Sequence, residues 1–168
     1  MEDTQLKYYY EMFDMKAHLI YYSKCLNWCK SLDTFSQILV TIITIIGISA
    51  IQMKYSNSEM WFYISIGIQI FALVLSLFFN YKDKIVQLEL LLRELNILFL
   101  KMSDDWHKVS NGELTSNEIH KLWIDFKSKN DSLEAPSGII GFFWYLNSAE
   151  KQANIYFNKY YVEPTKNE

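Results

Sequence analysis

Residues 34–53 read TFSQILVTIITIIGISAIQM, and residues 60–81 read MWFYISIGIQIFALVLSLFFNY. Neither segment contains a charged residue, and only the polar hexapeptide KYSNSE at 54–59 separates them. About twenty helical residues, at roughly 1.5 Å each, match the ~30 Å hydrocarbon layer of a bilayer. Buried helices of a soluble bundle rarely remain uncharged over such a length. The sequence therefore predicts an all-α membrane protein whose two spans, 34–53 and 60–81, form a transmembrane helical hairpin within the segment 34–81.

The composition agrees with one small helical protein. The chain has 168 residues, of which 51% are hydrophobic and 21% charged, with a formal net charge of -3. This small and mixed charge gives no reason to expect direct binding of nucleic acid. Residues 1–33 are polar and long, so we expect no cleavable signal peptide before the hairpin.

Two cysteines, Cys25 and Cys29, lie one helical turn apart. Two thiols alone do not complete a zinc site, although they could take a lipid or a metal. We interpret them as small buried or interfacial residues of a reduced compartment, and we expect no metal and no cofactor.

The polar parts of the chain are predicted to be helical and cytoplasmic. Residues 1–33 form an N-terminal helix, residues 82–110 continue the second span, and residues 111–168 form a helical C-terminal part. Apolar residues at spacings of four and three predict the core-facing stripe of the N-terminal helix: Leu6, Tyr10, Phe13, Ala17 and Ile20. The helix after the second span carries a heptad seam, expected to build an antiparallel stalk or an oligomer contact: Leu88, Leu92, Leu95, Phe99, Met102 and Trp106.

The C-terminal part has clear boundary signals. Asn111-Gly112 is predicted to end the long helix, and Thr115 with Glu118 forms a capping box for the next one. Residues 139–146 are aromatic and too short to span; they suit either the membrane surface or, as we prefer, the cytoplasmic core. A last helix is predicted at about 148–162.

Basic residues near the predicted spans set the expected orientation. The segments before the first span and after the second span carry more of them than the connecting loop does. These segments contain Lys24, Lys30, Lys82, Lys84 and Arg93, whereas the loop contains Lys54 alone. The positive-inside rule then places both termini in the cytoplasm and the loop outside.

Polar residues of the two segments fall on one face of each helix: Gln37, Thr41, Thr44 and Gln52 in the first, and Ser65, Gln69, Ser76 and Asn80 in the second. An amide facing lipid is costly, so these faces are expected to meet protein or water. One interpretation is hydrogen bonding between helices. The other is the wall of a water-filled pore in an oligomer. The sequence leaves both open.

Signatures of catalysis are missing from the sequence. It contains no nucleophile elbow, phosphate loop or dinucleotide fingerprint. Asp104, Asp105 and His107 form the one compact ligand-like group, which at a helix end is typical of a solvated cap. Arg93 is the only arginine, and no histidine follows it by four to six positions, unlike in helical HEPN ribonucleases. We therefore expect no enzymatic activity.

The order of segments resembles the SLATT family of two-transmembrane effectors, which occur with nucleotide-second-messenger synthases and SLOG sensors in bacterial anti-phage systems. The likeness covers about residues 5–106. It lies in the polar helix that runs through 17–37 into the first apolar segment, and in 64–93, where Leu73-Val74-Leu75-Ser76 leads into a leucine-rich helix.

The resemblance implies an oligomeric, pore-forming effector that permeabilises or depolarises the inner membrane when triggered, with membrane lipid and a sensor encoded nearby as partners. The alternative is a non-catalytic membrane anchor or accessory protein that recruits or modulates a soluble defence partner. The membrane protein that accompanies some RNA-guided Cas13 nucleases is one example of that class.

Overall fold

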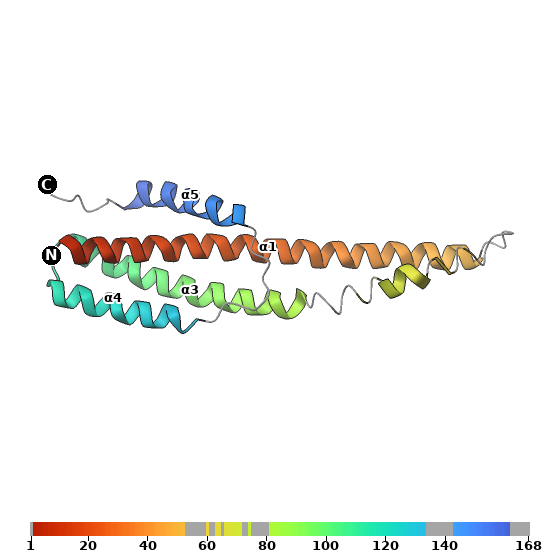
Figure 1. The fold of residues 1–168 in the computed structure, drawn as a ribbon, viewed down its shortest axis with the longest axis horizontal. Helices are drawn as coiled ribbons and strands as arrows, with labels where there is room; N and C mark the ends of the chain where they lie inside the picture. Colours follow the sequence, from red (N-terminus) through yellow and green to blue (C-terminus); the bar gives the residue numbers. More distant parts are fainter. Residues whose placement is uncertain are drawn as a thin grey trace. The chain divides into compact units, whose positions relative to one another are not determined.

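The computed structural model describes residues 2–52, 60, 63–64, 66–71, 74, 81–133 and 143–161, and it gives no side-chain positions for residues 2, 43–44, 46–52, 81 and 143–144. The regular structure of the described part is helical, without strands. Its bounded helices are α1 (Glu2–Gln52), α3 (Tyr81–Ser110), α4 (Ser116–Asp131) and α5 (Phe143–Tyr160), and the described residues among 60–74 are helical too (Figure 1). The all-helical part of the predicted fold class is therefore confirmed.

The predicted two-span transmembrane hairpin is wrong. Among the residues that the structure describes, no helix combines the length and the apolar character needed to cross a membrane. The prediction rested on the absence of charge in 34–53 and 60–81, and absence of charge does not by itself provide an uninterrupted apolar helix of membrane length. The connecting loop predicted at 54–59 lies outside the described residues.

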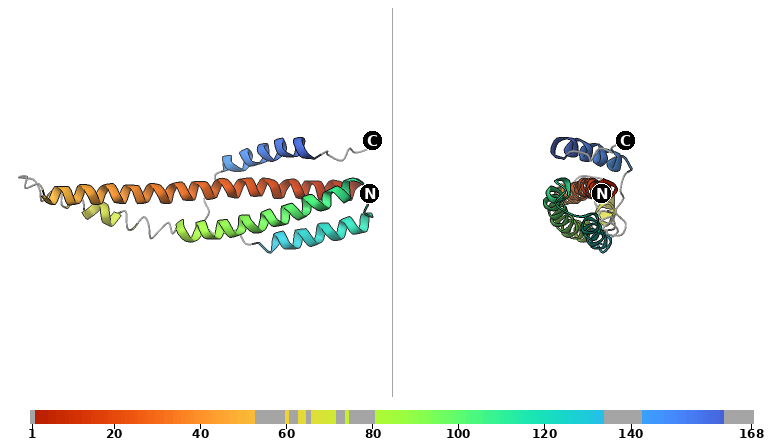
Figure 2. Two further views of the ribbon diagram at one scale, coloured as in Figure 1. Left: turned by 180° about the vertical axis from the view of Figure 1, so that it is seen from behind. Right: turned by 90° about the vertical axis from the view of Figure 1, so that its left-hand side faces the viewer.

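The chain divides into two compact units. Unit 1 combines Met1–Leu26 with Gln87–Glu168, and unit 2 is Asn27–Val86. Unit 1 is a helical bundle in which the N-terminal half of α1 lies between α5 on one side and α3 with α4 on the other (Figures 1 and 2).

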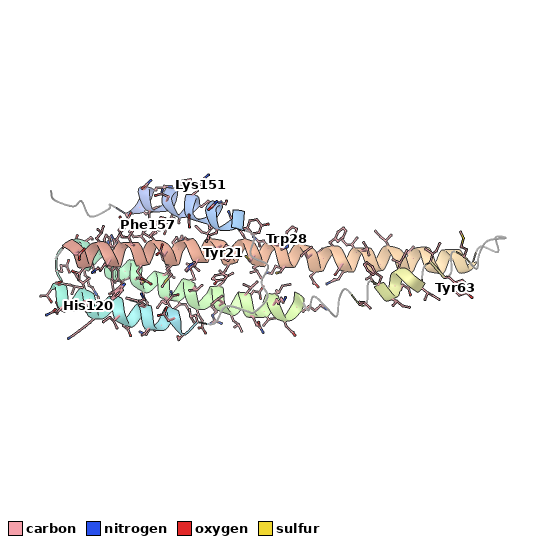
Figure 3. The ribbon with its side chains drawn as sticks, in the orientation of Figure 1. Tyr21, Trp28, Tyr63, His120, Lys151 and Phe157 are labelled. Carbon is pink, nitrogen blue, oxygen red and sulfur yellow. The ribbon has the colours of Figure 1, made fainter. Side chains whose placement is uncertain are left out.

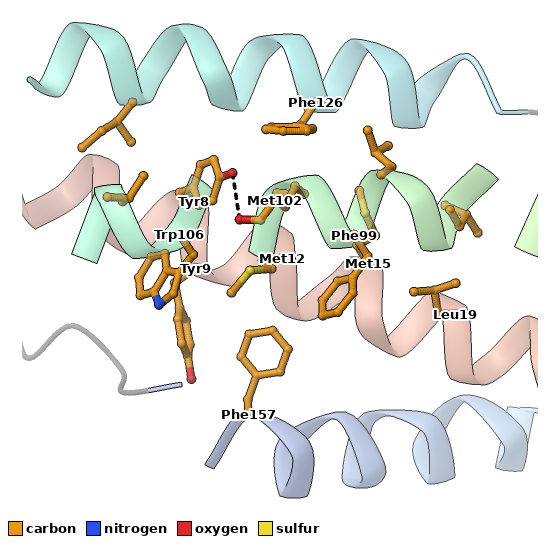
Figure 4. Packing of buried hydrophobic residues seen from close by; sticks show 14 of the residues in the cluster. Tyr8, Tyr9, Met12, Met15, Leu19, Phe99, Met102, Trp106, Phe126 and Phe157 are labelled. Atoms are coloured by element: carbon orange, nitrogen blue, oxygen red, sulfur yellow. Dashed lines mark hydrogen bonds between the residues drawn. The ribbon is translucent and has the colours of Figure 1, made fainter. Parts of the chain in front are cut away.

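Aromatic side chains, methionines and aliphatic side chains together form the core of unit 1. Tyr8 of α1 stacks on Trp106 of α3, with ring centroids 6.2 Å apart, and meets Phe126 of α4 edge-on at 6.1 Å. Its hydroxyl donates a hydrogen bond of 3.3 Å to the Met102 carbonyl (Figure 4). On the other side of α1, Phe157 of α5 packs edge-on against Tyr9, with centroids 5.3 Å apart. One tyrosine pair therefore joins α1 to the three other helices.

The buried face of α1 differs from the predicted stripe. Tyr10 is 49% exposed, whereas Tyr8, Met12 and Met15 are buried. The predicted stripe assumed one partner helix, but α1 has neighbours on two sides, so its buried arc is wider and centred elsewhere. Of the predicted positions only Ala17 is buried; Leu6, Phe13 and Ile20 are half-buried.

The boundaries between α3 and α4 agree with the sequence. Gly112, which follows α3, adopts a φ of 72°, a conformation that favours glycine. The predicted capping box at the start of α4 is confirmed: the Thr115 backbone amide donates to Glu118 Oε2 at 2.8 Å. This bond and the bond from the Thr115 hydroxyl to the same oxygen both lower the pKa of the Glu118 carboxyl. The last helix begins earlier than predicted, at Phe143, so it includes the end of the aromatic segment 139–146.

Candidate functional site

Unit 2 exposes large apolar side chains. We name the following set the apolar surface of unit 2: Phe35, Ile38, Val40, Ile42 and Ile45 of α1, with Met60, Tyr63, Ile64, Ile66, Ile68, Ile70, Phe71 and Val74. Phe35 is 63% exposed, and Tyr63, which is labelled in Figure 3, is 70% exposed. Exposed apolar patches of this kind mark surfaces that bind another molecule.

The α1 members of this surface are not confined to one stripe. At about 100° per residue, Val40 projects from a different side of the helix than Ile38 and Ile42. The exposed apolar side chains therefore cover more than one side of α1, apart from the face that carries Gln37 and Thr41.

Polar side chains in the same part of α1 donate hydrogen bonds back to their own helix. The Thr34 hydroxyl donates to the Lys30 carbonyl at 2.9 Å, and the Thr41 hydroxyl donates to the Gln37 carbonyl at 2.8 Å. The Gln37 amide donates to Asp33 Oδ2 at 2.8 Å. Such local bonds reduce the need of these groups for water.

The predicted polar faces are only partly described. Gln37 and Thr41 are exposed and Gln69 is half-buried. Ser65, Ser76 and Asn80 lie outside the described residues, as do the side chains of Thr44 and Gln52. The described members therefore come from both segments.

The predicted seam of 82–110 lies in unit 1. Five of its members are buried there and Leu92 is half-buried against the same core; the five are Leu88, Leu95, Phe99, Met102 and Trp106. Their exposed fractions are 4% or less, so within one chain these side chains are already covered.

Cys25 and Cys29 are buried thiols, and their burial agrees with the prediction. Burial raises the pKa of the Cys29 thiol, and the nearby Lys84 ammonium only partly opposes this rise. The thiol form is therefore favoured at neutral pH, and the thiol is a weak nucleophile.

An open pocket of about 320 Å³ lies between α1 and α5 in unit 1 and was not predicted. Its polar lining is Asp14, His18, Glu150, Lys151 and Asn154. Burial, together with repulsion from Glu150, raises the pKa of the Asp14 carboxyl, while His18 opposes the rise. The spacing of Asp14 and His18 was readable from the sequence, but the contribution of the last helix was not.

Within the described residues, no group of three or more His, Cys, Asp or Glu side chains is arranged to hold a metal ion. Asp105 instead forms an ion pair of 3.7 Å with Lys108 near the end of α3. This pairing fits the interpretation of that segment as a solvated helix end.

No family model matches the chain, and neither a curated protein nor a solved structure matches it. Function must therefore be inferred from the chain's own surfaces.

Proposed function

We propose that the protein is a non-catalytic effector that acts on a lipid bilayer. Unit 2 binds lipid through its apolar surface, and several copies together raise the permeability of the bilayer to ions after a trigger. The bacterial inner membrane and an anti-phage response are the setting that the SLATT resemblance implies. The two-span hairpin is not part of this proposal.

One observation carries the lipid proposal. From Thr34 to Gln52, α1 contains no charged residue, and its described side chains include exposed apolar groups as large as Phe35 and Ile45. Transferring such a side chain from water to an apolar medium contributes about 1.5–3 kcal/mol. Polar side chains that donate hydrogen bonds to their own helix oppose this transfer less than polar side chains without such bonds would. A lipid environment therefore suits this surface better than water does.

Flotation with vesicles of phosphatidylethanolamine and phosphatidylglycerol tests the proposal. The vesicles are loaded with potassium, so that binding and ion release are measured on one sample. The variant Ile38→Lys with Ile42→Lys adds two charges to the apolar surface. Each lysine costs about 2.5–3.5 kcal/mol in the apolar layer, so we expect at least a tenfold weaker association with the vesicles.

The matched control adds the same two charges to unit 1. Gln152 and Asn158 are exposed on α5, and Gln152→Lys with Asn158→Lys should leave binding within about twofold of wild type. Equal flotation of the two variants, or a wild-type protein that stays unbound, would refute lipid binding by this surface. Binding without potassium release would retain lipid association and remove the permeabilising activity.

A second candidate function is favoured by the pocket between α1 and α5. In this alternative the chain is an accessory protein that recruits a soluble partner, and the pocket accepts a polar or basic side chain of that partner between Asp14 and Glu150. An intact vesicle barrier together with loss of partner binding in Glu150→Lys would favour this candidate.

A further inference from the structure

α3 carries a second apolar face, which is not the face that joins the core of unit 1. Leu90, Ile97 and Leu100 are 56%, 46% and 57% exposed. Helical geometry places these three within an arc of about 80°, on the side of α3 opposite the buried Leu95 and Met102. The predicted seam of 82–110 is covered by the same chain. Of the two apolar faces of α3, the second is therefore the one exposed to another molecule.

This face follows a heptad pattern. Leu90, Arg93, Ile97, Leu100 and Asp104 succeed one another at spacings of three, four, three and four, and all five are exposed. Such spacing generates the contact line of two paired helices. We name these five residues the outer seam of α3.

The charges of the outer seam are self-complementary in one orientation. If a second α3 lies antiparallel, with the two-fold axis between Ile97 and Leu100, then Arg93 meets Asp104 of the second copy. Ile97 then meets Leu100 of the second copy. The same pairs repeat on the other side of the axis, because a two-fold contact is isologous.

The flanking residues follow the same rule. Glu94 and Lys101 are exposed beside the outer seam, and the antiparallel register sets Glu94 next to Lys101 of the second copy. A parallel arrangement would instead oppose Arg93 to Arg93 of the second copy, and like charges at such positions repel. The charge pattern therefore selects the antiparallel pair.

We propose that the outer seam of α3 is a homodimer interface, in which α3 pairs antiparallel with α3 of a second copy. Ile97 and Leu100 of each chain form its centre, Leu90 lies beyond the Arg93–Asp104 pairs, and the Arg93–Asp104 and Glu94–Lys101 pairs fix its register. This pairing lies wholly in unit 1, so it does not depend on lipid binding by unit 2.

Charge exchange on the full-length chain tests this interface. Arg93→Glu opposes Asp104 of the second copy with a like charge, and Asp104→Arg opposes Arg93 in the same way. Each contact occurs twice per dimer, so we expect either variant to raise the dimer dissociation constant by about tenfold. The double variant R93E with D104R exchanges the two partners and should return the constant to within about twofold of wild type.

The rescue separates pairing between chains from effects within one chain. Positions 93 and 104 are eleven residues apart, or about 16 Å along the helix, so their side chains do not pair within a single α3. Lys121 is exposed on α4, and Lys121→Glu changes the net charge as Arg93→Glu does without touching the outer seam. We expect this control to dimerise like wild type.

Sedimentation equilibrium in a mild non-ionic detergent measures the dissociation constants, and circular dichroism checks that each variant keeps its helix content. Weakening in both single variants with recovery in the double variant is the expected result. A monomeric wild type, a double variant as weak as the singles, or an equal loss in Lys121→Glu would overturn the proposal.

Discussion

The docking of α5 on α1 should depend on one ring, that of Phe157. The side chain is completely buried and belongs to the core of unit 1. Its ring packs edge-on against Tyr9 and Phe13, with both centroid distances 5.3 Å. Figure 4 shows Phe157 beside Tyr9. Replacing a buried phenylalanine by alanine removes the apolar burial and leaves a cavity, which together cost about 3–5 kcal/mol. Domains of this kind have a free energy of unfolding of about 5–15 kcal/mol, so Phe157→Ala removes a large part of it.

Urea unfolding followed by far-ultraviolet circular dichroism measures this loss, and hydrogen exchange of the α5 amides localises it. The matched control is Ile155→Ala on the same helix, because Ile155 is 69% exposed; its cost should stay within about 0.5 kcal/mol apart from helix propensity. We expect faster exchange throughout α5 in Phe157→Ala alone. Equal unfolding midpoints and equal exchange in the two variants would refute the packing argument.

Two further predictions concern charge and capping. The pKa of the Asp14 carboxyl is raised by burial and by Glu150. The folded state therefore holds the carboxyl proton of Asp14 more tightly than the unfolded state does. Ionisation of Asp14 lowers the free energy of unfolding as the pH rises above the ordinary aspartate range. Asp14→Asn should therefore be more stable than wild type at pH 7 and should lose this advantage below about pH 3.8. Urea titrations at both pH values measure the difference. An advantage that does not change with pH would contradict the raised pKa of Asp14. Thr115→Ala should lower the free energy of unfolding by about 0.5–2 kcal/mol and move the pKa of Glu118 upward, as measured by carboxyl NMR; an unchanged Glu118 pKa would contradict the capping box.

The sequence predicted the structure well where a residue type determines the local backbone conformation by itself. Gly112 and the Thr115–Glu118 pair fix the end of one helix and the start of the next through backbone conformation and capping, which need no tertiary context. The heptad positions of α3 similarly identified side chains that are buried in unit 1, such as Leu95 and Met102.

The sequence was misleading where burial depends on the number of neighbours. Tyr8, Tyr9 and Tyr10 are chemically identical, yet the first two are buried and the third is exposed. The positions of α3, α4 and α5 decide which ring is covered, and α5 contributes Phe157, far away in the sequence. The pocket at Asp14 escaped prediction for the same reason, because half of its lining comes from α5.

The polar residues of 34–53 raise a more specific point about what a sequence can decide. Their spacing suggested either a pore wall or hydrogen bonding between helices, since both would satisfy groups that lipid cannot. The structure adds a third way of satisfying them: Thr41 donates to the Gln37 carbonyl, and Gln37 donates to the Asp33 carboxylate. A hydroxyl or amide that donates to a group four residues back on its own helix has a smaller need for water or for a neighbouring helix. Periodicity alone therefore does not distinguish a polar contact face from a helix that carries its own partners, and the variants at Ile38 and Ile42 test the surroundings of this helix more directly than substitutions of its polar residues would.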